Sequence, residues 1–197
     1  MIKREEALTL LKKHMSQENL LRHCYAVESV MRALARFFKE DEEKWGVVGL
    51  LHDGDYEETK ATPEKHTLLM SQWLKELGET DSEILSAILS HNYAHLVDAE
   101  IGDGSVAQPP KNKLEWSLFC CDELTGLIVA VALVKPEKNL ASVSVDSIMK
   151  KWKEKSFAAG VKRPQIEECE PRLGIPLKEF VGIALEAMQG ISQDLGL

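Results

Sequence analysis

Apolar residues recur every three or four positions along most of the chain, and this spacing constrains the fold more than any other feature. The pattern is clearest between Glu18 and Phe38, where one stripe holds Leu20, Cys24, Val27, Met31, Leu34 and Phe38. Such a period is typical of an amphipathic helix, and no stretch alternates apolar and polar residues as a half-buried strand does. We therefore predict an all-α fold of about seven or more helices without a sheet.

Residues that start and stop helices set the expected boundaries. Thr62 suits an N-cap and Pro63 a first helical position, so we expect one continuous helix from there to Leu77, stopped by Gly78. The two glycines of segment 41–53 suggest that this helix packs closely against a neighbour. Segment 97–112, with its glycines and prolines, is expected to be a long loop. The remaining predicted helices are 5–15, 81–91, 114–134, 146–155, 164–170 and 176–195.

Charge and cysteine content limit the binding partners and the cellular compartment that we expect for the protein. The 197 residues include 24 basic and 32 acidic side chains, a net charge of −8, which argues against nucleic acid or an anionic membrane as the partner. The four cysteines form no Cys-x-x-Cys motif, and the N-terminal segment is too charged for a signal peptide. The longest apolar run, 124–134, is shorter than the roughly 20 residues that a membrane span needs. We expect a cytoplasmic protein.

Several ionisable side chains fall on the inward faces of different predicted helices. A lone inward histidine is usually a satisfied core residue, and a lone His-Asp pair at a helix end usually faces solvent. Asp122, however, lies in a segment that is apolar nearly all round, where an uncompensated carboxylate would cost several kcal/mol. Imidazole and carboxylate are both ligands for divalent metals, so one shared metal centre would satisfy the whole set. The set comprises His23, His52, Asp53, His66, His91 and Asp122.

The order of these residues resembles the HD-domain superfamily of metal-dependent phosphohydrolases, in its subset with two extra histidines and two metals. The resemblance covers about residues 18–135 and implies a helical HD-domain, phosphodiesterase-like bundle, with residues 136–197 as a helical C-terminal extension packed on the same core. It also implies that His23, His52, Asp53 and Asp122 hold one metal, that His66 and His91 hold a second, and that Asp53 bridges them. His52 and Asp53 would then be the catalytic residues.

The chain departs from the family pattern at two places. Many relatives read His-Asp-Ile-Gly-Lys, whereas this chain reads His52-Asp53-Gly54-Asp55-Tyr56 and lacks that lysine. Relatives often carry a His-His pair where this chain has His91-Asn92. Both changes leave the metal set intact and leave the substrate open.

The chemistry of such a centre favours phosphoryl hydrolysis. Two divalent ions about 3.5–4 Å apart can lower the pKa of a bridging water, and the metal-bound hydroxide can attack phosphorus in line. One or two ions of Fe, Mn, Co, Ni or Zn suit these ligands. The expected substrate is a small phosphorylated molecule, with a nucleotide as one candidate. Side chains placed to grip phosphate, unless they are simply exposed, are Arg22, Lys60, Lys65, Lys111 and, if the helix ending at His91 continues, His95.

The C-terminal segment offers a further basic surface. Beyond Pro136 the composition changes, and Lys150, Lys151, Lys153 and Lys155 share a helix that Lys162 and Arg163 follow. This basic run is either a solvated helix face or a wall that faces phosphate.

Two other functional classes remain open at this point. Some HD-fold proteins use a mixed-valent di-iron pair and O₂ with a similar ligand set, so an oxygenase is the first alternative. A non-catalytic domain that senses nucleotides through its metal centre is the second.

Overall fold

The computed structural model describes residues 1–93 and 109–197, and over these residues every regular element is helical. The prediction of an all-α fold with seven or more helices and no sheet is therefore confirmed for the described part of the chain. The α-helices are α1 (Arg4–His14), α2 (Glu18–Phe38), α3 (Glu42–Leu51), α4 (Tyr56–Thr59), α5 (Leu68–Glu76), α6 (Ser82–His91), α8 (Lys113–Leu133), α9 (Val145–Trp152), α10 (Arg163–Glu167), α11 (Leu177–Gly190) and α12 (Ser192–Leu195). The shorter turns are η1 (Pro63–Lys65), η2 (Leu140–Ser142) and η3 (Cys169–Leu173).

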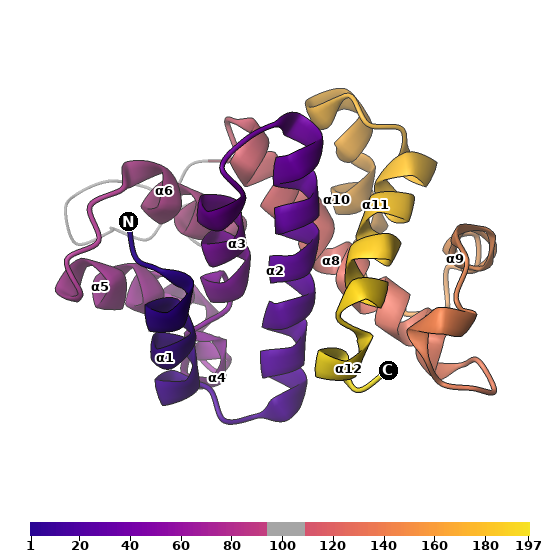
Figure 1. Ribbon diagram of the computed structural model, residues 1–197, viewed down its shortest axis with the longest axis horizontal. Coiled ribbons are helices and arrows are strands. Elements are labelled where there is room, and N and C mark those ends of the chain that lie inside the picture. Colours follow the sequence, from indigo (N-terminus) through magenta and orange to yellow (C-terminus); the bar gives the residue numbers. More distant parts are fainter. Residues whose placement is uncertain (94–108) are drawn as a thin grey trace.

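Helix α2 stands at the centre of the molecule, with α1 and α3–α6 to one side and α11 to the other (Figure 1). Its observed span is the span that the periodicity predicts. The stripe packs against α3, α8 and α11, and Cys24, Val27, Met31 and Leu34 are all fully buried. The long helix is therefore held by apolar burial on several sides, which is the main stabilising contribution to a helix in a protein.

A glycine brings α3 against α2, as the sequence predicts. A Cβ atom added at Gly49 would lie 2.9 Å from the Cα of Glu28 and 2.9 Å from the Cγ of Met31. Backbone atoms cannot yield as a flexible side chain can, so only glycine allows this approach. The close contact places the C-terminal end of α3, where His52 follows, beside the inward face of α2.

Helix α8 forms the other long wall of the core. Its first backbone amides are capped by the Asn112 side chain, which accepts a hydrogen bond from the Glu115 N–H at 3.0 Å. Among the described helices, this is the one that is long and apolar enough to cross a membrane by length and composition alone. More than half of its most apolar 18-residue window is buried inside the protein, as in the core helix of a globular domain.

The predicted continuous helix over residues 62–77 is wrong. The chain forms the short turn η1, extends at His66 (ψ 137°), passes through a left-handed residue at Thr67 (φ 70°), and only then begins α5 at Leu68. A β-branched residue at positive φ is unfavourable, so the surrounding structure must hold this break in place. The break turns His66 toward the interior.

The C-terminal helices add to the same hydrophobic core. Phe180, Val181 and Ala184 of α11 are fully buried, and α11 packs against both α2 and α8. Helix α10 packs against α8, and α9 lies at the edge of the molecule (Figure 1). The segments expected as helices at 146–155, 164–170 and 176–195 form α9, α10 followed by η3, and α11 with α12. The division at residue 135 into two units stays a prediction.

Candidate metal centre

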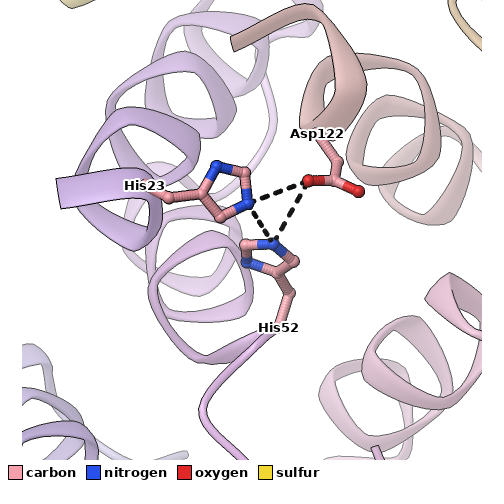
Figure 2. Close-up of side chains that lie close together, drawn as sticks. All are labelled: His23, His52 and Asp122. Atoms are coloured by element: carbon pink, nitrogen blue, oxygen red, sulfur yellow. Dashed lines mark hydrogen bonds and ion pairs between the residues drawn. The ribbon is translucent and has the colours of Figure 1, made fainter. Parts of the chain in front are cut away.

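Three helices direct one side chain each at a common point. His23 comes from α2, His52 follows the last residue of α3, and Asp122 comes from α8 (Figure 2). The His23 Nε2 atom lies 3.2 Å from His52 Nε2 and 3.0 Å from Asp122 Oδ1, and His52 Nε2 lies 3.5 Å from Asp122 Oδ1. We call these residues the first group.

Asp53 connects the first group to two further histidines. Its Oδ2 atom lies 3.6 Å from His23 Nε2 and 3.7 Å from His52 Nε2. Its Oδ1 atom lies 3.1 Å from His66 Nε2 and 3.2 Å from His91 Nε2. The two oxygens of one carboxylate therefore face two different pairs of histidines. We call His66 and His91 the second group.

The turn after α3 explains how neighbouring residues can serve both groups. The Gly54 N–H donates to the Leu51 carbonyl at 3.0 Å, and the Tyr56 N–H donates to the Asp53 carbonyl at 2.9 Å. These bonds continue the chain in a tight turn beyond the helix, so the side chain of His52 enters the core while that of Asp53 points between the two groups. The sequence predicted that the His-Asp pair ends a helix, and the structure confirms it.

Hydrogen bonds at the far nitrogen orient the histidine rings of the first group. The His52 Nδ1–H donates to the Gly49 carbonyl, with 2.8 Å between the atoms. The Thr125 hydroxyl donates to the Asp122 carbonyl at 2.8 Å, so its oxygen can accept from His23 Nδ1 at 3.3 Å. In both rings the proton on Nδ1 leaves the lone pair of Nε2 free for a metal ion, as is usual for metal-binding histidines.

Asp55 plays the corresponding part in the second group, and sequence reasoning missed it. Its side chain is fully buried, and Oδ1 accepts from His66 Nδ1 at 2.7 Å while Oδ2 accepts from the Met70 N–H at 3.0 Å. Asn92 donates from Nδ2 to the His66 carbonyl at 3.2 Å. These bonds hold the break before α5. The available signal was a second acidic residue two positions after Asp53, at the position where the motif His-Asp-Ile-Gly-Lys has glycine.

The charges of the centre act strongly on one another. Burial lowers the pKa of His23, but the hydrogen bond with Asp122 and the charges of Asp122 and Asp53 outweigh it and raise that pKa to about 9. Burial likewise lowers the pKa of His66, whereas Asp53 and Asp55 raise it to about 10. Burial opposes ionisation of Asp53 and Asp122, yet the surrounding histidines hold the pKa of both carboxyls well below the usual range.

The donor atoms fit divalent metal ions. Ligands about 2.1 Å from an ion lie about 3.0–3.4 Å from one another in octahedral or tetrahedral sites. The first-group distances of 3.0, 3.2 and 3.5 Å lie within about 0.1 Å of this range. Without an ion, the Nε2 atoms of two histidines would face each other inside the protein beside a single carboxylate. His91 Nδ1 is also buried without a hydrogen-bond partner among the described residues. The first group with Asp53 would hold one ion, and Asp53 with the second group would hold another.

A cavity of about 620 Å³ opens over this centre. Four of the six predicted ligands line it, namely Asp53, His66, His91 and Asp122. Within residues 1–93 and 109–197, the other lining side chains are Tyr56, Thr59, Lys60, Pro63, Asn92, Tyr93, Phe119, Glu123, Lys162 and Gln165. The centre is therefore open to a small molecule on the side of the second group.

The predicted phosphate-binding residues are distributed unevenly around the cavity. Lys60 lines it, while Lys65 and Lys111 do not. Arg22 lines a different cavity of about 360 Å³ between α2 and α8. His95 lies outside the described residues, as does most of the expected loop 97–112. Lys162, which the sequence placed in a basic run of uncertain role, does reach the main cavity.

The fold and this donor set define a helical protein with a cluster of histidine and aspartate side chains that could hold a metal ion. Comparison with protein families matches residues 20–124, which is more than half of the chain, to the HD domain. The protein belongs to the HD domain family. Searches of curated proteins and of solved structures found no match.

Proposed function

We propose that the protein is a metal-dependent phosphohydrolase that cleaves a phosphoester or phosphoanhydride bond of a small molecule. The observation that carries the proposal is the placement of Asp53, whose Oδ1 and Oδ2 atoms face different pairs of histidine nitrogens at 3.1–3.7 Å. One carboxylate aimed at two adjacent sites suits a two-metal centre of the kind that performs phosphoryl transfer to water. Membership of the HD domain family supports the same class of reaction.

One or two divalent ions, when bound, would supply Lewis acidity toward phosphoryl oxygens and lower the pKa of a coordinated water. The chain itself supplies the orientation. Gly49 and Asp55 fix the rings of His52 and His66 through Nδ1. Lys60, which has no ion-pair partner among the described residues, faces the same cavity and would attract the phosphate of the substrate. The cavity volume of about 620 Å³ suits a small substrate, with a nucleotide as one candidate.

We also propose that the protein works in a reducing compartment. All four cysteines are free and buried, a state that suits the cytosol better than an oxidising environment. We keep the prediction that neither nucleic acid nor a membrane is the partner, because it follows from the net charge of −8.

The proposal is tested by metal analysis of protein purified without chelators or metal resin, followed by assays of phosphate release. The assays use nucleotides, dinucleotides, cyclic nucleotides and simple esters, with Mn²⁺, Fe²⁺, Co²⁺, Ni²⁺ or Zn²⁺, in the absence of oxygen. Phosphate release under these conditions is expected. Strict dependence on O₂ with an iron paramagnetic signal would replace the proposal with the oxygenase, and tight nucleotide binding without turnover would replace it with the sensor.

A further inference from the structure

Part of the wall of the main cavity comes from outside the residues that match the HD domain. The match ends at residue 124, yet Lys162 and Gln165 line the cavity together with the metal ligands Asp53 and Asp122. Both residues lie at or in α10, which packs against α8. The C-terminal segment therefore adds side chains of its own to the site.

Helix α10 is held firmly at this position. The Arg163 guanidinium donates to the carbonyls of Trp152 at 3.1 Å and Phe157 at 2.7 Å, which ties α10 to the chain before it. The Gln165 Nε2–H donates to the Phe119 carbonyl at 2.7 Å, which ties it to α8. These are structural contacts, and they fix the start of α10 next to the cavity.

Lys162 differs from these neighbours because its ammonium group makes only a loose contact. Its backbone N–H donates to Glu123 Oε2 at 3.1 Å, while Nζ lies 3.8 Å from Glu123 Oε1. The Lys162 side chain is 67% exposed, so this ion pair contributes little to stability. Its ammonium can therefore contact another anion. Glu123 and Lys162 line the cavity together with Asp122, so that anion would lie near the proposed metal centre.

The charges that line the cavity favour such an anion. With two divalent ions bound, their positive charge would offset Asp53, Asp122 and a dianionic phosphoryl group. Among the described residues, the other charged side chains of the lining are Lys60, Lys162 and Glu123, which together leave one positive charge in excess. A second negative group on the substrate would balance it.

We propose, on the basis of the function proposed above, that Lys162 selects phosphate esters whose leaving group carries a second anionic group. Tyr93 and Phe119 lie in the same lining with ring centroids 6.0 Å apart, and they offer an aromatic surface to the leaving group. Lys162 is a specificity residue that contacts the leaving group, while the metal centre acts on the phosphoryl group.

The test compares phenyl phosphate with 4-carboxyphenyl phosphate, which differ by one carboxylate on the leaving group. Wild-type protein should hydrolyse the carboxylated ester with a kcat/KM about fivefold higher, the effect of one partly exposed ion pair. Lys162→Met should lower the ratio of the two kcat/KM values from about five to about one, mainly by raising the KM of the carboxylated ester. Lys155→Met is the matched control, because Lys155 is an exposed lysine of the same segment that does not line the cavity.

A binding measurement separates this inference from the proposed function. Calorimetry with phenylphosphonate and 4-carboxyphenylphosphonate, on metal-loaded protein, should show the same fivefold preference and its loss in Lys162→Met. If wild-type protein releases no phosphate, the proposed function fails and the binding preference alone decides the role of Lys162. An equal preference in wild type and Lys162→Met, with both variants folded by circular dichroism, overturns the inference.

Discussion

The two groups of the metal centre are built in different ways. The first group comes from α2, α3 and α8, whose apolar faces are buried in one core. In the second group, His66 lies in an irregular segment between η1 and α5, and His91 is the last residue of α6. Helix packing therefore positions the first group, whereas side-chain hydrogen bonds from Asp55 and Asn92 position His66 of the second group. The second group should be the more sensitive to single local changes.

A change at Asp53 should affect both groups equally, because one of its carboxylate oxygens faces each group. Asp53→Ala should lose both ions and reduce activity to background, the largest effect of any single change. Metal stoichiometry by mass spectrometry, with circular dichroism to verify folding, measures the result. Retention of one full equivalent of metal would show that Asp53 belongs to one group only.

Changes of single histidines should separate the two groups. His66→Ala should lose the ion of the second group and keep the other, because the first group retains His23, His52, Asp122 and one oxygen of Asp53. His23→Ala should affect mainly the first ion. The stoichiometry of each variant under equal metal concentrations measures the selectivity, and equal loss of both ions in the two variants would contradict the assignment of two sites.

A matched pair of variants tests how the histidine rings are held. Asp55→Asn leaves at least one of the two buried donors, His66 Nδ1–H or Met70 N–H, without its acceptor, and should weaken the second ion roughly 10–100-fold. Thr125→Val removes the longer contact to His23 Nδ1, which involves no charged partner, and should weaken the first ion only about threefold. Competition titrations with a chromophoric chelator measure both affinities.

A larger loss of metal affinity in Thr125→Val than in Asp55→Asn would mean that helix packing alone does not position the ligands of the first group. Asp55→Asn should also lower the free energy of unfolding of the metal-free protein by roughly 1–3 kcal/mol, since a buried donor or acceptor is left unpaired. Chemical denaturation measures that change separately from metal affinity.

The same difference explains what the sequence could predict. The span of α2 and five of the six proposed ligands could be predicted because each lies on or directly after a helix with a clear apolar period. His66 was also predicted to face inward, but from a continuous helix over 62–77 that does not form. The break depends on Asp55, a residue distant in sequence from the segment that it holds, and no local pattern shows that contact.

The substrate side of the site was less predictable for a related reason. Which lysine reaches a cavity depends on how helices pack, and charge runs in the sequence carry no such information. Arg22 is adjacent to His23 in sequence and lines, together with His23, the cavity between α2 and α8 instead of the main cavity. Lys162 reaches the site only because α10 packs on α8.

The stability of the metal-free protein should depend on pH in the same direction through both groups. This is the smallest effect that we expect. In the metal-free protein the pKa of His23 is raised to about 9 and that of His66 to about 10, above the value of about 6.5 in an unfolded chain. A group whose pKa is raised by folding stabilises the fold fully below its unfolded pKa and loses that contribution as the pH rises through the folded pKa. Metal-free protein should thus melt at a lower temperature at pH 10 than at pH 6.5.

The stabilisation that metal gives should increase as the pH rises, in contrast to the stability of the metal-free protein. A bound ion needs neutral imidazoles, and these are more populated at higher pH. Loading at pH 7.5 must displace protons from His23 and His66, so calorimetry in buffers of different ionisation enthalpy should show the release of about two protons. The increase in melting temperature caused by metal should then grow from pH 6.5 to pH 9, as fewer protons compete. His66→Gln should release about one proton on loading its remaining ion, through His23. Metal binding without proton release would mean that the carboxylates do not hold these histidines in the charged form. The prediction that both groups contain a protonated histidine in the metal-free protein would then be wrong.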